Sequence, residues 1–281
     1  MMASLVVLSG DQHVNALGTG LCPPVVVRDD GSNHRPNKTL RAIWRKRQQA
    51  WAYVQELKRQ RLKRDLTTYV VIGGDAVDRN THDGVSLIAK MRSTILDNAI
   101  EVFAPVADIA DHLFFLRGTE AHTGDRAELE EILAHDLGAE PDEVTGADSW
   151  WHLPLEVEGV TFDLAHHPQT AAARPWTWPA AAARHAVIIR NQYQDADERV
   201  PDVAVRFHRH HYQPGPHLPK PWFFYAPSWQ LTTPFGYRVG AGAIVEPVGL
   251  LIFIVEDGRV TLDDSQIFKF PKRKPWRVKG E

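Results

Sequence analysis

The chain has 281 residues, of which 43% are hydrophobic and 24% charged, and its formal net charge is −3. These values fit a globular protein with a sizeable core and exclude a global positive field that would require nucleic acid as a partner. The single cysteine, Cys22, excludes an intrachain disulfide and favours a reducing compartment. Because we find neither a signal-peptide pattern nor an apolar run of about 20 residues, we expect a cytoplasmic protein without a membrane partner.

Five short apolar runs each end at a group of His, Asp or Glu residues. Turn residues bound the runs, as is typical of buried strands, and the runs cover residues 5–8, 69–72, 113–116, 160–165 and 203–205. Ligand groups just past the carboxyl ends of such strands converge in one crevice of an α/β sheet. Repeated imidazoles and carboxylates are the ligand set of a transition-metal site, so the pattern predicts such a site.

The first half of the chain predicts strands that alternate with helices. Residues 14–36, rich in Gly, Pro, Asn and Asp, predict a long loop insertion on the substrate side of the site, with a surface excursion as the alternative. Residues 38–65 predict a long amphipathic helix with a basic outer face. Residues 83–105 and 125–137 predict two more helices, and Gly138 is placed to end the second. The alternation implies a largely parallel sheet.

The second half predicts short strands with few helices between them. Only residues 179–190 have a helical pattern, and Asp257-Gly258 predicts a tight hairpin turn. The expected strands lie within residues 150–165, 203–207, 222–229, 250–256 and 259–262. We expect one domain over residues 1–265 and a basic, mobile C-terminal tail over residues 266–281.

Two pairs of side chains have the spacing of ligands that share one ion. Asp11 and His13 are separated by one residue, which in an extended segment puts both side chains on the same face, and His208 and His210 repeat this spacing. Asp75 follows two glycines, where the backbone can approach closely. Its carboxylate has enough lone pairs to bridge two cations, so together with a histidine from a further strand the set predicts two ions.

The order of these groups resembles the calcineurin-like metallophosphoesterase superfamily. Asp-x-His, Gly-Asp, Gly…His, His and His-x-His follow successive strands over residues 4–212, and the strands to residue 256 complete the sheet. Within the superfamily, residues 20–24 and 117–122 are similar to the phage- and prophage-encoded branch, which implies host cytoplasm. The resemblance implies a four-layer α/β/β/α sandwich with mixed sheets. It also implies two divalent metal ions, for which Mn²⁺ is favoured and Zn²⁺, Fe²⁺ and Ni²⁺ are the alternatives.

The resemblance carries a role to each matching residue. Six side chains match the metal ligands of the family: Asp11, His13 and His210 at the first metal, Asp75 between the metals, and His166 and His208 at the second. His167 is the alternative to His166, which we prefer because the ligand of the family commonly precedes x-Pro.

One motif departs from the pattern of the family. The family has Gly-Asn-His-Asp/Glu, whereas here Gly118 is followed by Thr119, Glu120, Ala121 and His122. Glu120 would replace the Asn as a harder, charged ligand that favours Mn²⁺. Equally, Thr119 would occupy the Asn position and leave Glu120 behind it. In both cases His122 is the candidate acid.

The activity implied by the resemblance is phosphoester hydrolysis, in which metal-activated water attacks phosphorus in line. His122 would protonate the leaving oxygen, and Arg209 would stabilise the phosphoryl charge or merely offset the carboxylates. Aromatic residues within 173–179 and 222–229, with local basic stretches, favour a nucleotide, DNA or RNA phosphodiester as substrate. The alternatives are a phosphomonoesterase and a catalytically silent metal-containing binding protein. The sequence does not determine the oligomeric state.

Overall fold

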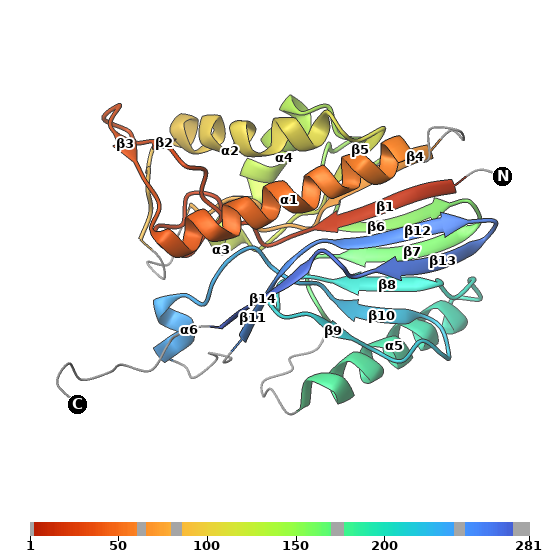
Figure 1. Cartoon of the computed structure of the whole chain (residues 1–281). Helices are drawn as coiled ribbons and strands as arrows, with labels where there is room; N and C mark the ends of the chain where they lie inside the picture. The colour runs from red at the N-terminus through yellow and green to blue at the C-terminus, as the bar shows by residue number, and fades with distance from the viewer. Residues whose placement is uncertain (1–2, 61–65, 80–85, 170–176, 239–244, 272–281) are drawn as a thin grey trace, which may run out of the picture.

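Two five-stranded mixed sheets pack face to face, and helices cover the outer face of each sheet (Figure 1). The computed structural model describes residues 3–60, 66–79, 86–169, 177–238 and 245–271. Among the helices of these residues, none combines the length and the apolar character needed to cross a membrane.

The first sheet has the strand order β13-β12-β1-β4-β5. Its parallel strands are β1 (Ala3–Ser9), β4 (Leu66–Ile72) and β5 (His112–Phe115). The antiparallel strands β12 (Leu251–Glu256) and β13 (Arg259–Asp263) complete it on the other side of β1. The three parallel strands end at the same edge of the sheet, so the residues that follow them lie close together.

The second sheet has the strand order β6-β7-β8-β10-β9. Its parallel strands are β7 (Val160–Ala165), β8 (Val203–Arg206) and β10 (Trp222–Tyr225). The antiparallel strands β6 (His152–Val157) and β9 (Gln213–Pro214) lie at its two edges. The carboxyl ends of β7 and β8 therefore supply a second set of loops.

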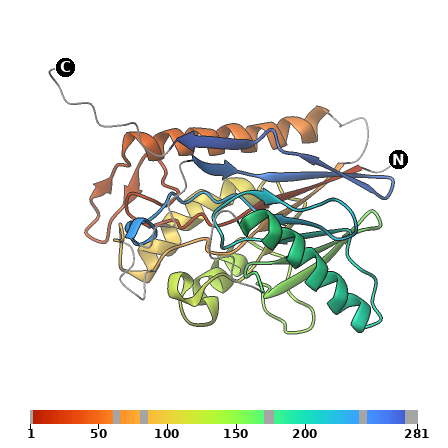
Figure 2. The same cartoon turned by 90° about the horizontal axis from the view of Figure 1, so that it is seen from below.

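The long helices form the two outer layers. Those on the first sheet are α1 (Lys38–Gln60), α2 (Arg92–Ala107) and α4 (Glu128–Asp136). Helix α5 (Trp178–Asp195) lies across the second sheet, as Figure 2 shows from below. The short elements are α3 (Glu120–Thr123), η1 (Asp125–Ala127), α6 (Pro234–Arg238), and the strand pairs β2 (Val26–Val27) with β3 (Asn33–His34) and β11 (Val245–Gly249) with β14 (Ile267–Pro271).

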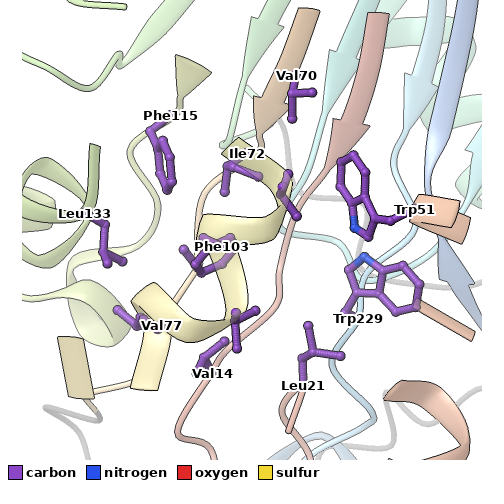
Figure 3. Packing of buried hydrophobic residues seen from close by; sticks show 14 of the residues in the cluster. Val14, Leu21, Trp51, Val70, Ile72, Val77, Phe103, Phe115, Leu133 and Trp229 are labelled. Carbon is purple, nitrogen blue, oxygen red and sulfur yellow. The ribbon is translucent and has the colours of Figure 1, made fainter. Parts of the chain in front are cut away.

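Three hydrophobic clusters separate the four layers. Because successive side chains of a strand point to opposite faces, Leu5 of β1 joins the cluster under the helices and Val6 joins the cluster between the sheets. Figure 3 shows part of the first cluster, where Trp51 of α1 and Trp229 are buried together. A third cluster joins α5 to the second sheet. Burying each large aliphatic side chain contributes about 1.5–3 kcal/mol, so these clusters hold the layers together. The predicted α/β/β/α sandwich is confirmed.

The helix expected over residues 83–105 is shifted along the chain. Residues 80–85 lie outside the described part, and the helix begins at Arg92. The residues just before it are not helical because their backbone bonds to the loop after β1; the Ile88 N–H donates to the Asn15 carbonyl at 3.0 Å. Helical pattern alone does not register such a tertiary partner.

Three other helix boundaries differ from expectation. The first helix is described only to Gln60, because residues 61–65 lie outside the described part. Helix α5 extends beyond the expected 179–190 at both ends. The helix expected over 125–137 is split into η1 and α4, since Arg126 and the following alanine, the last two residues of η1, adopt positive φ. Gly138 does follow α4 with φ +67°, as predicted for a helix-ending glycine.

In the second half of the chain, the hairpin turns and the C-terminal strand can be compared with the predictions. Asp257 and Gly258 both adopt positive φ between β12 and β13, so the predicted primed turn is confirmed. A similar turn at Glu158, which the sequence analysis missed, divides residues 150–165 into two strands. The expectation that the tail begins at residue 266 needs correction: β14 pairs with β11. Residues 272–281 lie outside the described part.

The segment over residues 14–36 is built into the fold for much of its length. Leu21, Cys22 and Val26 are buried under the helices, and burial raises the pKa of the Cys22 thiol to about 12. This thiol is therefore a small core side chain rather than a reactive group. Whether the rest of the segment covers a substrate stays a prediction.

Candidate metal centre

The predicted ligands follow β1, β4, β5, β7 and β8 and meet where the two sheets end together. Backbone hydrogen bonds join the loops: the Asp11 N–H donates to the Gly74 carbonyl and the His13 N–H to the Asp75 carbonyl, both at 2.9 Å. Glycine is required at position 73, because a Cβ there would lie 2.2 Å from the Phe207 ring. The close packing of these loops brings together side chains that are distant in sequence.

Four overlapping groups of donor atoms lie at this edge, and in each group the three atoms are within 4.8 Å of one another. The groups are Asp11 with His13 and His210; Asp11 with Asp75 and His166; His13 with Asp75 and His122; and His166 with His167 and His208. Imidazoles and carboxylates in overlapping sets suit a pair of divalent transition-metal ions. Every predicted ligand except Glu120 belongs to at least one group.

Asp75 lies between the two sets of histidines. Its Oδ2 atom is 3.2 Å from Nε2 of His166 and 3.7 Å from Nε2 of His13. Its Oδ1 atom accepts the backbone N–H of Thr119 at 2.6 Å, which fixes the carboxylate. The side chain is buried, with 1% of its surface exposed. A buried carboxylate in this position fits the shared ligand of two ions, as the resemblance implied.

His166 and His167 both reach the centre, but in different ways. The Nδ1 atom of buried His166 is 2.8 Å from the Gly73 carbonyl, which leaves Nε2 facing Asp75. Metal-binding histidines are commonly oriented by such a contact through the other ring nitrogen. His167 is exposed, and its Nε2 atom is 3.3 Å from the Thr119 hydroxyl. The geometry therefore favours His166 as the inner donor and puts His167 at the rim.

The Thr119 hydroxyl, rather than the Glu120 carboxylate, lies among the donors. It is 3.2 Å from Asp75 Oδ2, 3.2 Å from His208 Nδ1 and 3.5 Å from His166 Nε2. Glu120 starts α3 with an exposed side chain and belongs to none of the donor groups among the described residues. The turn into α3 points consecutive side chains in different directions, and Thr119 is the one turned inward. The geometry therefore favours Thr119 over Glu120 at the Asn position, and Glu120 as a ligand stays a prediction.

A buried carboxylate that was not among the predicted site residues lies beside His122. Nδ1 of His122 is 3.3 Å from Oδ2 of buried Asp78, and Nδ1 of His13 is 3.4 Å from the same oxygen. Burial by itself would lower the pKa of His122, but the Asp78 and Asp75 carboxylates raise it above its usual value. Asp78 stands three residues after Asp75, and this spacing was the available signal.

Glu130 joins two of the ligand loops, those that follow β4 and β5. Its carboxylate accepts the Ala76 N–H at 3.0 Å and the Gly118 N–H at 2.5 Å, and the side chain is fully buried. Burial, with a smaller effect of Asp75, raises the pKa of Glu130 to about 8. It lies among three acidic residues in the first turn of α4, so nothing in the residue pattern singles it out.

The two arginines near the ligands have other partners. Arg117 donates to the Ser149 hydroxyl and to Glu131, both at 2.9 Å. The charge of Arg209 acts on His211, His185 and Tyr225, and it is not among the strongest influences on the two buried ligand carboxylates. The role of Arg209 in binding phosphate stays a prediction.

Five of the predicted ligands have a backbone conformation that residues other than glycine rarely adopt. The φ angles are +51° at Asp11, +46° at His13, +50° at Asp75, +67° at His208 and +52° at His210. Each left-handed residue costs about 1–2 kcal/mol. Strain of this kind persists where the surrounding structure imposes it and clusters at functional sites. The strained φ angles at the ligand positions are therefore a second observation in favour of a functional site, separate from the distances among the side chains.

The electrostatics of the centre suit cations. Burial alone would raise the pKa of Asp75, but His166 and His13 lower it well below its usual value. Burial alone would lower the pKa of His166, but Asp75 and Asp11 raise it to about 10. In the absence of metal, a proton is therefore held between Nε2 of His166 and the Asp75 carboxylate. A divalent cation would take the place of that proton.

Comparison with known proteins gives a limited result. No protein-family model matches the chain, and no curated protein matches it. Similar solved structures include a Vps29 single mutant from Entamoeba histolytica, with TM-score 0.37, 13% identity, and 95% of this chain and 99% of that chain covered. Vacuolar Protein Sorting 29 from Cryptosporidium parvum has TM-score 0.35, 13% identity, and 96% and 99% coverage. Vps29 from Chaetomium thermophilum has TM-score 0.38, 12% identity, and 96% and 97% coverage. At these TM-scores the similarities support no inference about activity.

Proposed function

We propose that the protein is a dinuclear metal-dependent phosphoester hydrolase of the calcineurin-like metallophosphoesterase type. The observation that carries the proposal is the position of Asp75, whose Oδ2 atom lies between His13 and His166 within two overlapping donor groups. A purely structural metal site needs no shared carboxylate. The strained backbone at five ligand positions supports the same conclusion.

The donor set would divide between two ions. Asp11, His13 and His210 would hold one ion, and His166, His208 and the Thr119 hydroxyl the other, with Asp75 shared. When bound, the ions would supply Lewis-acid polarisation of the phosphoryl group and a lowered pKa of water. The chain itself contributes the fixed orientation of the ligands, through the Asp75 contact with the Thr119 N–H and the His166 contact with the Gly73 carbonyl.

His122 would act as the acid for the leaving oxygen. Its raised pKa keeps the imidazole protonated nearer to neutral pH, which a general acid requires. Oδ2 of Asp78 lies 3.3 Å from Nδ1 of His122, on the side of the ring away from Nε2, so Nε2 is the nitrogen that would donate the proton. The acid thus lies in the same donor group as His13 and Asp75, next to the shared carboxylate.

The finer proposal is a phosphodiesterase or nuclease that acts on nucleic acid or nucleotides, with Mn²⁺ as the metal. Its support is a pair of aromatic rings beside the ligands: half-buried Trp178 stacks on buried His211, the residue after His210, with ring centroids 3.7 Å apart. The aromatic residue at position 176 lies outside the described part. A phosphomonoesterase is the alternative within the same chemistry.

A catalytically silent metal-binding protein is a second candidate. The observation that favours it is Thr119, because a hydroxyl is a weaker ligand than the amide that the family has there. Against it stands the intact pair of His122 and Asp78, which a silent site would not need.

The test compares hydrolysis of bis(p-nitrophenyl) phosphate and p-nitrophenyl phosphate with Mn²⁺, Ni²⁺, Zn²⁺ or EDTA, with single-stranded DNA in parallel. We expect metal-dependent cleavage of the diester, its loss in Asp75→Asn, and retention in the matched Glu120→Gln variant, whose side chain is exposed. A protein that binds two ions yet hydrolyses none of these substrates would favour the silent binding protein.

A further inference from the structure

A pocket of about 370 Å³ lies beside the metal centre, on the helix-covered face of the second sheet. Asp163 and Ala165 of β7 and Arg206 of β8 form its floor, and the end of α5 forms one wall with Tyr193 and Ala196. We refer to it as the β7–α5 pocket. Nothing in the proposed metal chemistry uses it.

The floor of the β7–α5 pocket is a closed polar network. Buried Asp163 accepts the Tyr193 hydroxyl at 2.9 Å, lies 2.9 Å from Nε2 of His152, and pairs with Arg206 at 2.5 Å. Arg206 also donates to the backbone carbonyl of Asp163 at 3.0 Å. Asp163 and Arg206 pair with each other within the floor, so neither presents an unpaired charge to the pocket.

The walls offer amides and apolar surface. The Gln169 amide donates to the Gln192 side-chain oxygen at 2.9 Å, which ties the loop after β7 to α5. Glu198 adds a negative charge to the lining. Among the described residues that line the pocket, Arg206 is the only Lys or Arg, and it is already paired with Asp163. This lining disfavours a second phosphate and favours an uncharged group with hydrogen-bonding edges.

The β7–α5 pocket and the metal centre share His167. This residue lines the pocket, and it also forms a donor group with His166 and His208. Its Nε2 atom is 3.3 Å from the Thr119 hydroxyl, which in turn is 3.2 Å from Asp75 Oδ2. His167 is therefore the residue past which a substituent of a phosphoester held at the centre would enter the pocket.

We propose that the β7–α5 pocket binds the nucleoside part of a phosphoester whose phosphoryl group lies at the metal centre. The volume suits a flat, uncharged base, and the amides of Gln169 and Gln192 supply both donors and acceptors for its edges. This inference rests on the proposed phosphoesterase function and names the substituent that the site selects. Binding energy from such a remote group raises kcat/KM when it positions the phosphoryl group.

The test uses two diesters with the same leaving group, thymidine 5′-(p-nitrophenyl phosphate) and methyl p-nitrophenyl phosphate. Because p-nitrophenolate leaves from both, a difference in kcat/KM reports the other substituent. We expect the thymidine ester to be preferred by about tenfold or more. Ala196→Trp, which fills the pocket, should bring the ratio close to one. Gln194→Trp, an exposed change on α5 outside the lining, should keep the ratio.

The outcomes separate this inference from the proposed function. Metal-dependent hydrolysis of both esters with no preference for the nucleoside overturns the β7–α5 pocket and leaves the phosphoesterase intact. An unchanged preference in Ala196→Trp also overturns it. If that variant does not fold, Gln192→Trp fills the same pocket from the preceding helical turn. Hydrolysis of neither ester with any metal overturns the proposed function and the pocket together.

Discussion

The hydroxyl of Thr119 lies 3.2 Å from Oδ2 of Asp75, so the residue after Gly118 faces the shared carboxylate directly. The same hydroxyl is within 3.5 Å of three histidine nitrogens, on His166, His167 and His208. In the pattern that this chain resembles, an asparagine amide stands at this position. The second metal is therefore expected to depend on a weaker oxygen ligand than is usual.

Substitutions at Thr119 test this assignment. We expect Thr119→Ala to weaken binding of the second ion by about 10–100-fold and Thr119→Asn to retain or strengthen it. Glu120→Gln should leave both ions unaffected, because the Glu120 side chain is exposed and outside the donor groups. Titration calorimetry with Mn²⁺ measures the two affinities. Loss of the second ion in Glu120→Gln would restore Glu120 as the ligand.

The pairing of His122 with Asp78 predicts a change in the pH profile. Removing the charge of Asp78 in Asp78→Asn should lower the pKa of His122, so the acid form is lost at lower pH and the alkaline limb of kcat moves down. His122→Ala should reduce kcat by about 10²–10⁴-fold for esters with poor leaving groups. The loss should be smaller for p-nitrophenyl esters, whose leaving oxygen needs no proton. An equal loss for both ester classes would argue against the acid role.

Metal binding should release a proton from the centre. The pKa of His166 is raised to about 10, so at neutral pH an incoming ion must displace a proton from this ring. Affinity should therefore rise with pH up to that value. Calorimetric titrations in two buffers with different ionisation enthalpies count the protons released. A binding enthalpy independent of the buffer at pH 7 would contradict the expectation.

Glu130 predicts the pH dependence of stability in the metal-free protein. Its pKa in the folded state, about 8, is raised above the ordinary value, so the folded state holds the proton more tightly. The corresponding stability is fully present below about pH 4.5 and is lost as the pH rises through 8. Urea unfolding in EDTA at pH 5 and pH 8 measures this loss. Glu130→Gln should flatten the dependence, whereas Glu101→Gln, an exposed change on α2, should not.

The ligands at the strand ends could be predicted from sequence because the signal for each one lies within a few neighbouring residues. An apolar run followed by Asp11 or Asp75 needs no knowledge of the rest of the fold, and the buried strands put these residues at one edge. Thr119 and Glu120 were not separable, since their directions depend on the turn into α3. Glu130 could not be predicted from sequence. Its role is seen only in the structure, where its carboxylate accepts hydrogen bonds from two backbone N–H groups.

The metal centre draws its ligands from both halves of the chain. Asp11 and Asp75 follow strands of the first sheet, whereas His166 and His208 follow strands of the second. The chain has one cysteine, so no disulfide can join these halves. Bound ions would fasten one sheet to the other as a cross-link does, and opening of the sandwich would require their release. Removal of the ions by a chelator is therefore expected to loosen the packing of the two sheets as well as to remove the catalytic metals.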